Sequence, residues 1–469
     1  MRPSFLRIGG PDSTNRKIFH AALTVGLLGA VARIGAAVKE LIVAQAFGRS
    51  DALDAFLIAL LLPAFVLTLV MNSLGSALIP VFVETRQKKG PDAAQDLLSS
   101  MMFLSVSALA VIGVLLAMFA PFYLPFMGSS FSVEKLRLTR RLLYCILPFV
   151  LFGGFATFVS AVLNAGRKFA LPALVPLVTP LVTMALILLG PRSWGVFSLA
   201  VGAVAGSALE AAILLRALKA HGMRLTFRWN GLDSGVRSVL GQYAPVLAGS
   251  FLMGGTSVVD QSMAAMLPAG SVAALSYAGK IPGLFLAIGA TALSTAALPY
   301  FSQMVAQSDW NGCRHTLKRY SVLILLTTVP SALFLMAFSM PLVRLVFQRG
   351  AFTSVDTDLV SWVQICYSIQ IPFYICGMLF VRFLSSIRRN DVLMYGAGIS
   401  LILDISLNLI LMRKLGIAGI ALSTSLVYVV AFLFLGTYSV RLLGQEQAPV
   451  PQAEGDLTGC AGESNPMLK

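Results

Sequence analysis

The chain has 469 residues, of which 57% are hydrophobic and only 12% are charged, and its formal net charge is +15. A soluble globular domain carries about twice this share of charge, so the composition excludes that class and predicts a chain solvated mainly by lipid. The five cysteines and three histidines are scattered without metal-binding or catalytic spacing, so we expect no metal site and no cofactor.

Apolar stretches of about 20 residues, enough to cross the hydrocarbon core of a bilayer, recur along the whole chain. They predict transmembrane helices at 19–46, 52–84, 95–120, 141–165, 168–190, 194–217, 237–267, 270–303, 319–347, 356–387, 391–412 and 415–441. The segment before the first helix is polar and basic, and no small-residue cleavage site follows that helix, so we expect it to be retained. The predicted fold class is an all-α polytopic membrane protein with about twelve transmembrane helices.

Basic residues lie mainly in alternate loops, which places most of them on one side of the membrane. They are concentrated before the first helix and in the loops after the second, fourth, sixth, eighth and tenth helices. Because short cytoplasmic loops hold the excess of Lys and Arg, both termini are predicted to lie in the cytoplasm of a bacterial inner membrane. The positions give no nucleic-acid-binding surface. The basic cluster at 135–141 lies on the opposite side, where an amphipathic helix on the membrane surface would accommodate it.

The chain contains an internal repeat. The spacing from Pro63 to Pro80 in the first half is identical to the spacing from Pro282 to Pro299 in the second half. Six helices separate the copies, so both halves have the same orientation in the membrane, which is the arrangement of a parallel repeat around a central cavity. The predicted organisation is a cytoplasmic N-terminus (1–18), a six-helix bundle (19–218), a cytoplasmic linker (219–236), a second six-helix bundle (237–443) and a disordered cytoplasmic tail (444–469). We expect hinges at Gly35, Pro63, Pro282 and Gly283, with a helix break at the Pro282–Gly283 step.

Several charged residues fall within predicted spans, where a charge costs on the order of 3 kcal/mol. The first span contains Arg33, Lys39 and Glu40, and the eighth contains Lys280. Asp260 in the seventh span occupies the place equivalent to Glu40 in the repeat. Such residues usually face a cavity or a partner, so we predict an anion-binding cavity with a carboxylate nearby for ion coupling. Salt bridges within the bundle, such as Arg33 with Glu40, are the alternative.

Weaker candidates lie elsewhere in the chain. Asp404 and Asn408 in the eleventh span and Glu210 in the sixth are polar residues at membrane depth. Asp54 lies near the start of the second span, where a solvated carboxylate next to a helix N-terminus is the favoured interpretation and a gating role the alternative.

Two regions of the sequence resemble the MurJ/MviN family of lipid II flippases, which belongs to a superfamily with polysaccharide flippases and multidrug exporters. The first consists of Arg33–Ile34–Gly35, Lys39–Glu40–Leu41–Ile42–Val43–Ala44, Ala46–Phe47–Gly48 and Asp54–Ala55–Phe56. The second consists of Val346–Phe347–Gln348–Arg349–Gly350–Ala351–Phe352–Thr353, Asp356–Thr357, Asn408–Leu409, Leu415–Gly416–Ile417–Ala418–Gly419–Ile420–Ala421 and Thr424–Ser425. The resemblance covers roughly residues 20–440.

The resemblance implies a V-shaped bundle whose cationic cavity accepts a lipid diphosphate-linked glycan. Arg33 and Lys280 match cavity arginines of the family, and Lys39 with Glu40 stands where the family has arginine and aspartate. Asp54 matches an acidic residue on the periplasmic side. The sequence departs from the family in its two lysines, its uncharged stretch 64–73 and its end after twelve rather than fourteen spans, so an exopolysaccharide unit is an alternative cargo to lipid II.

We therefore expect a flippase without enzymatic activity that moves an undecaprenyl diphosphate-linked glycan across the inner membrane by alternating access. Arg33, Lys39 and Lys280 would neutralise the diphosphate, and Glu40 or Asp260 would bind a coupling Na⁺ or H⁺. The sequence contains no phosphate-binding Walker loop, so it encodes no ATP hydrolysis. The alternatives are a cation-coupled multidrug exporter of the same superfamily and a scaffold that recruits cell-envelope synthesis enzymes, which are also expected partners of a flippase.

Overall fold

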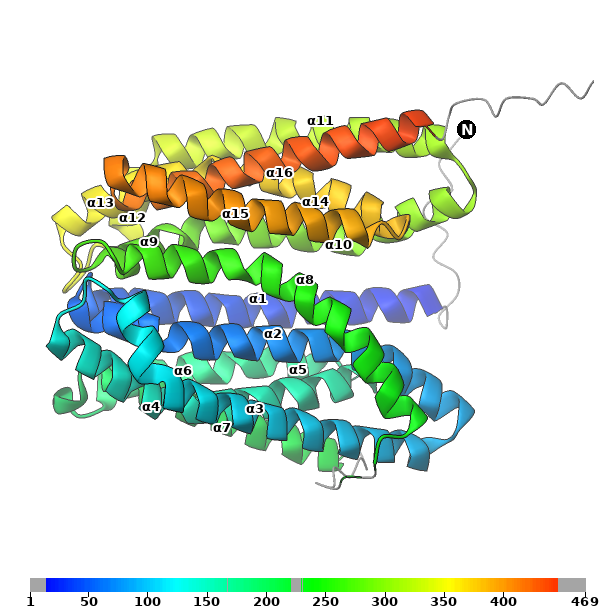
Figure 1. Ribbon diagram of the computed structural model, residues 1–469, viewed down its shortest axis with the longest axis horizontal. Helices are drawn as coiled ribbons and strands as arrows, with labels where there is room; N and C mark the ends of the chain where they lie inside the picture. The colour runs from blue at the N-terminus through cyan, green and yellow to red at the C-terminus, as the bar shows by residue number, and fades with distance from the viewer. Residues whose placement is uncertain (1–13, 167, 221–228, 230, 446–469) are drawn as a thin grey trace, which may run out of the picture.

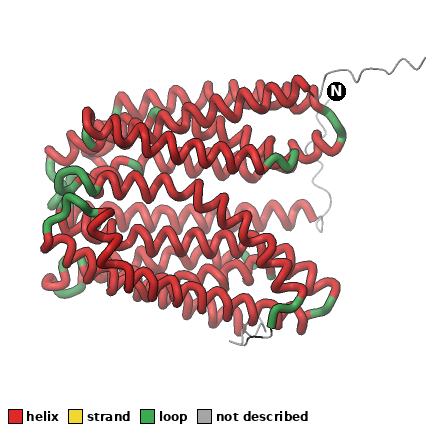
Figure 2. Tube along the Cα trace, viewed as in Figure 1, coloured by secondary structure: helices red, strands yellow, loops and turns green. Residues whose placement is uncertain are grey.

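The computed structural model describes residues 14–166, 168–220, 229 and 231–445. Within these ranges the chain consists of helices joined by short loops (Figure 2). The expectations for the N-terminal segment, the linker and the tail fall largely outside the described residues.

The first half of the chain contains seven α-helices and two short 3₁₀ turns. They are α1 (Thr14–Phe47), α2 (Asp51–Lys88), α3 (Pro91–Met127), α4 (Val133–Ala165), α5 (Ala170–Leu174), η1 (Val175–Leu177), α6 (Val178–Leu189), η2 (Arg192–Trp194) and α7 (Phe197–Ala220). The basic residues at 135–141 belong to the first turns of α4, so the surface helix proposed for them is wrong. The reason is that Ser132 caps α4 by accepting a hydrogen bond from the Lys135 backbone N–H, and the helix then continues without interruption.

The second half begins with α8, the long helix that follows the linker. Its helices are α8 (Ser234–Ala264), α9 (Ser271–Ala278), α10 (Lys280–Ala306), α11 (Trp310–Ala337), α12 (Ser339–Phe347), α13 (Ser354–Ser368), α14 (Gln370–Ser386), α15 (Asn390–Leu415) and α16 (Ile417–Gln445). Within the described residues, nine stretches are long and apolar enough to cross a membrane, and the bent pair α9–α10 makes a tenth. α1 and α8, of 34 and 31 residues, are long enough to cross as well but are not among these stretches, so the count of twelve spans stays a prediction. The prediction of an all-α polytopic membrane protein is confirmed.

The eighth span breaks at a different residue from the one predicted. The axes of α9 and α10 meet at 40° at Gly279, so the break precedes Lys280 rather than following it. Pro282 lies in the first turn of α10, where a helix needs no backbone N–H donor and proline is tolerated. The equivalent Pro63 lies inside α2, which continues through it. The two copies of the repeat therefore differ at their matched prolines.

The helices form two bundles that meet closely at one end of the molecule (Figure 1). α1–α7 form one bundle and α9–α16 the other, and α8 packs against α2 in the first and α15 in the second. A buried apolar core at the end where α1 turns into α2 draws residues from both bundles, including Ala55, Leu142, Ala273 and Phe352. Two further cores each lie largely within one bundle. The bundles are therefore joined through a shared core at one end and through α8.

Candidate functional site

A cavity of about 250 Å³ lies between the two bundles, near the end at which they meet. α1 and α10 bring Lys39, Glu40 and Lys280 to its wall. The Glu40 carboxylate forms salt bridges with both lysines: its oxygens lie 2.7 Å from Nζ of Lys39 and 3.3 Å from Nζ of Lys280. The three side chains remain 20–40% exposed, so solvent or a ligand reaches them. Two cations against one anion leave an excess of positive charge.

The triad of Lys39, Glu40 and Lys280 joins residues from different halves of the repeat. Lys280 begins α10, at the break with α9, and this bend turns its side chain toward Glu40 on α1. The predicted alternative of a salt bridge between Arg33 and Glu40 is not what the structure contains, because Glu40 pairs with the two lysines. Arg33 is exposed and lies seven residues before Glu40, about 10 Å farther along α1. It extends the positive charge of α1 away from the end at which the bundles meet.

The contact between the bundles at their joined end is called the seal here; it consists of the α1–α2 turn (45–54), the start of α9 and the α12–α13 loop (348–356). Arg49 donates to Asp356 at 2.8 Å, and the Ala351 backbone N–H donates to the Gln45 carbonyl at 2.9 Å. Gly350 has φ +58°, and a Cβ there would lie 2.4 Å from the Gln45 carbonyl oxygen. The backbones of the two bundles thus approach closely enough to require glycine.

Asp54 is the most buried acid of the seal, with 1% of its surface exposed. Its carboxylate accepts the backbone N–H groups of Gly270 at 2.7 Å and Ala273 at 2.8 Å, and lies 3.1 Å from the Lys135 ammonium. The interpretation of Asp54 as a solvated carboxylate at its own helix is therefore wrong. Ser50 caps α2, and Asp54 instead satisfies the free N–H donors at the start of α9 in the other bundle.

A second polar cluster lies inside the second bundle, where α8, α15 and α16 meet. The Asp260 carboxylate accepts from Asn408 Nδ2 at 2.7 Å and from Thr424 Oγ1 at 3.0 Å. Asp404 and Asn408 are fully buried, and within the described part of the chain no hydrogen-bond donor reaches the carboxyl oxygens of Asp404 or Oδ1 of Asn408. Asp404 interacts with Asp260, which is itself an acceptor. No group of three or more His, Cys, Asp or Glu side chains suited to a metal occurs in the described part of the chain.

The remaining predicted residues have local surroundings that the structure defines. A Cβ on Gly35 would lie 2.0 Å from Leu177 Cδ1, so this glycine permits close packing of α1 on η1. A Cβ built on Gly283 would have no neighbouring atom within 4 Å, so no close packing requires a glycine there. Glu210 accepts the Thr179 backbone N–H at 3.0 Å in the first turn of α6, which is the place of a capping carboxylate.

Several residues of these sites were not predicted from the sequence. In the sequence, Lys135 is notable only because it lies on the side opposite to most basic residues. In the structure it pairs with both Asp51 and Asp54. Arg49 had no predicted partner, and its partner Asp356 is 307 residues away. The sequence did offer a signal for Asp356: the spacing of Thr353 and Asp356 is that of a capping box at a helix start. The structure contains this capping box.

Comparisons with known proteins give consistent results. A family model described as "Lipid II flippase MurJ" matches residues 43–450. The "Probable lipid II flippase MurJ" of Thermotoga maritima is 26% identical over 405 residues, which cover 86% of this chain and 81% of that protein. The "Lipid II flippase MurJ" of Burkholderia cenocepacia is 25% identical over 421 residues, which cover 87% of this chain and 80% of that protein.

Two solved structures share the fold. One is titled "Lipid II flippase MurJ, inward closed conformation"; it superposes with a TM-score of 0.77 at 24% identity, covering 89% of this chain and 87% of that one. The other is an inward-facing multidrug resistance transporter of the MATE family, with a TM-score of 0.72 at 13% identity, covering 91% and 98%. At these identities the likeness concerns the helical architecture alone.

Proposed function

This chain belongs to the MurJ family of lipid II flippases, and on that basis we propose that it moves an undecaprenyl diphosphate-linked glycan, lipid II or a related precursor, across the bacterial inner membrane. The triad of Lys39, Glu40 and Lys280 is the observation that carries the proposal. A diphosphate is a compact polyanion, and lysine ammonium groups bind phosphate as point charges. Before the substrate binds, Glu40 holds both ammonium groups in place, and the incoming diphosphate replaces it as their counter-ion.

The seal supports a direction for the cycle. With both termini in the cytoplasm, as the basic loops indicate, the seal lies on the periplasmic side. This conformation then loads the head group from the cytoplasmic side, where Arg33 extends the positive charge along α1. Release requires the seal to open, so the hydrogen bonds of Asp54 and the Arg49–Asp356 pair must break in each cycle. Alternating access is thus a rocking of one bundle against the other about α8.

The cluster around Asp260 supports cation coupling. Two neighbouring buried carboxylates without a basic partner require a cation or a proton between them. Carboxylate, amide and hydroxyl oxygens are the ligands that hard cations prefer, and Asp260, Asp404, Asn408 and Thr424 provide them. We propose that Na⁺ or H⁺ binds here. The cluster connects α8 to α15 and α16, so binding of the cation there changes how α8 packs against α2. This change links cation binding to the rocking of the bundles.

Two features weigh against a multidrug exporter of the same superfamily. An exporter of organic cations needs an acidic cavity, whereas the triad has an excess of positive charge. The MATE transporter shares only 13% sequence identity with this chain, so the similarity between the two concerns the fold alone.

The proposal is tested by mass spectrometry of lipids that co-purify with the protein. The variants are Lys280→Ala and Lys39→Ala, and the matched control is Lys88→Ala, whose lysine pairs with an acid in the same way but has 72% of its side chain exposed. We expect the native protein and the control to retain an undecaprenyl diphosphate glycan and each cavity variant to lose most of it. The mass distinguishes lipid II from an exopolysaccharide unit. Retention of ordinary phospholipids without any such glycan would contradict the proposal.

A further inference from the structure

A second cavity, larger than the one between the bundles, lies within the second bundle between α8, α14, α15 and α16. Its volume is about 310 Å³, and it shares no lining residue with the cavity between the bundles. Two of its lining residues, Ile399 and Val430, are also 50% and 42% exposed, so the cavity opens toward the outside of the bundle. Both residues are apolar and belong to membrane-spanning helices, so this opening faces the hydrocarbon of the bilayer.

The cavity is elongated along the helices. Its lining extends from Leu393 to Asp404 on α15 and from Thr424 to Leu435 on α16. Each of these stretches advances by eleven residues, which is about 16 Å at the rise of an α-helix. The hydrocarbon core of a bilayer is about 30 Å thick, so one leaflet is about half as deep. The cavity therefore has the length and the direction of an acyl chain in a single leaflet.

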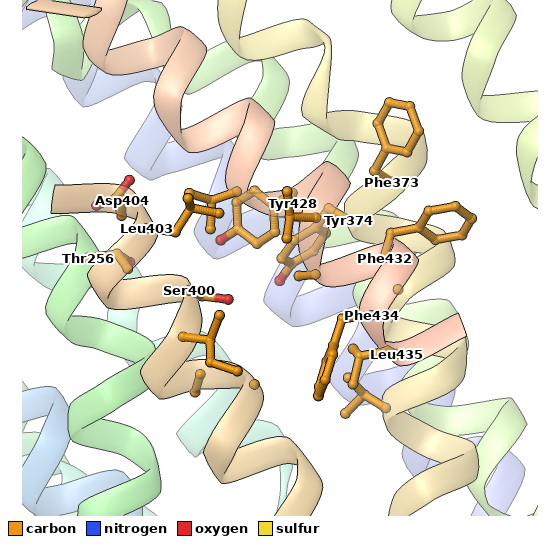
Figure 3. Close-up of a pocket in the computed structure, with 18 of the residues that line it drawn as sticks. Thr256, Phe373, Tyr374, Ser400, Leu403, Asp404, Tyr428, Phe432, Phe434 and Leu435 are labelled. Carbon is orange, nitrogen blue, oxygen red and sulfur yellow. The ribbon is translucent and has the colours of Figure 1, made fainter. Parts of the chain in front are cut away.

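The wall of the cavity is mainly apolar and aromatic. Tyr374 and Tyr428 form an edge-to-face pair with ring centroids 5.0 Å apart, and Phe434 borders the same open space (Figure 3). Among the described lining residues, Asp404 carries the only carboxyl group, and its interaction is with Asp260 in the polar cluster. No lysine, arginine or histidine belongs to this described lining. The cavity therefore offers its contents a hydrocarbon surface and suits an uncharged chain.

A stacked pair of side chains closes the end of the cavity that lies away from the seal. The Arg389 guanidinium lies over the ring of Tyr438, 5.6 Å from the ring centroid. Arg389 comes four residues before Leu393, and Tyr438 comes three residues after Leu435. Each is therefore about one helical turn beyond the outermost lining residue of α15 or α16. The first charge beyond this end of the apolar cavity is thus a cation.

Two further arginines accompany this stacked pair. Arg388 directly precedes Arg389 in the loop between α14 and α15, and Arg441 lies on the face of α16 that carries Tyr438, three residues later. Both side chains are exposed. In the described part of the chain, Asp391 is the acid that pairs with this group, 3.1 Å from Arg389. Three guanidinium groups and one carboxylate leave an excess of positive charge, which complements a phosphate group.

We propose that the second bundle binds one anionic phospholipid, with an acyl chain in this cavity and its phosphate group at Arg388, Arg389 and Arg441. The chain fills a space that the protein leaves open, so the lining side chains gain contacts. A zwitterionic phospholipid offers the same chain without the net negative charge, so it binds more weakly. The bound lipid is a ligand of the second bundle and not the cargo of the central cavity, so this site does not depend on the proposed flippase activity.

The test is photo-cross-linking of the full chain in phosphatidylcholine nanodiscs. A trace of phosphatidylglycerol or phosphatidylcholine probe is added; the two probes have identical acyl chains, one of which ends in a diazirine. Mass spectrometry measures labelling of the cavity residues on α14, α15 and α16 relative to α3 at Val111 and Val114, which are 58% and 64% exposed. This ratio should be about fivefold or more higher for phosphatidylglycerol, as one exposed ion pair predicts.

The role of the arginines is tested by replacing all three. The variant Arg388→Gln/Arg389→Gln/Arg441→Gln should give equal ratios with the two probes, because only the acyl chain is then recognised. The matched control replaces three exposed basic residues near the start of α11 with glutamine: Arg314, Lys318 and Arg319. α11 lies in the same bundle but contributes no described residue to the cavity lining, so the control should keep the preference for phosphatidylglycerol.

The role of the cavity is tested by filling it. Gly377 on α14 lines the cavity and has nothing within 4 Å of a built Cβ, so Gly377→Leu should lose most of the cavity labelling by both probes. Gly398 on α15 has the same free space but does not line the cavity, so Gly398→Leu should be labelled as the native protein is. Thermal unfolding establishes that each variant is folded.

Three results would overturn the proposal. The first is equal labelling of the cavity residues by the two probes in the folded native protein. The second is loss of the phosphatidylglycerol preference in the α11 control to the same extent as in the triple arginine variant, because the preference would then reflect general surface charge. The third is cavity labelling in Gly377→Leu that equals the labelling in Gly398→Leu.

Discussion

The seal offers a sharp test because two neighbouring acids share one lysine but only one of them bridges the bundles. Asp54 contacts Lys135 and also accepts hydrogen bonds from two backbone N–H groups of the other bundle. Among the described residues, Asp51 pairs only with Lys135 and has 62% of its side chain exposed. Asp54→Asn keeps one acceptor oxygen and places an N–H₂ group against an N–H donor. Asp51→Asn removes only an exposed ion pair.

The magnitudes follow from these contacts. One lost hydrogen bond to a charged acceptor costs about 1.5–3 kcal/mol, which corresponds to a shift of about 10- to 150-fold in the equilibrium between sealed and open states. An exposed ion pair contributes at most about 1 kcal/mol, or about fivefold. Asp54→Asn should therefore open the seal far more often than Asp51→Asn, although both substitutions remove the same charge from the same region.

The assay is labelling of a reporter cysteine from outside the cell. Ser276→Cys lines the central cavity, and the five native cysteines are replaced by alanine so that it reacts alone. A membrane-impermeant maleimide reaches it from the periplasm only when the seal is open. We expect labelling to rise by about tenfold or more with Asp54→Asn and to change little with Asp51→Asn. Equal labelling of the two folded variants would refute the assignment of Asp54 as the acid that closes the seal.

Three further predictions address the triad, the glycine of the seal and the buried acids. Glu40→Gln removes the counter-ion of both cavity lysines. The affinity for undecaprenyl diphosphate, measured by calorimetry, should therefore rise by about fivefold. An unchanged or weaker affinity would contradict the displacement of Glu40 by the substrate. Gly350→Ala should increase labelling in the same assay, because its Cβ would collide with the Gln45 carbonyl. Gly90→Ala, also at positive φ but with open space around its Cβ, should leave labelling unchanged. Equal labelling of the two variants would mean that the close backbone approach at Gly350 does not hold the seal closed. If Na⁺ is the coupling ion, NaCl should raise the melting temperature above its value in choline chloride. Asp260→Asn should remove this increase, and the exposed Asp391→Asn should retain it; an increase that survives Asp260→Asn would place the cation elsewhere.

Most of the architecture could be predicted from the sequence because lipid imposes a simple rule. A segment that crosses the hydrocarbon core must satisfy its backbone hydrogen bonds internally, so a long apolar stretch is a helix wherever it occurs. The twelve predicted spans and the family resemblance in the 346–353 run needed no tertiary information. The cavity cations Lys39 and Lys280 could be identified because charge at membrane depth is costly and therefore rare.

The tertiary structure decided which charges meet. Glu40 directly follows Lys39 in the sequence, whereas Lys280 belongs to the other half of the chain, and only the bend at Gly279 brings all three together. The same holds for Asp54, whose sequence neighbourhood suggests a solvated helix start but whose donors come from the start of α9. Hydropathy and helix periodicity are local properties, so the sequence by itself determined the helices and the positions of the charges along them. Pairing depends on how the bundles pack, which is why partners in opposite halves of the chain were determined by the fold alone.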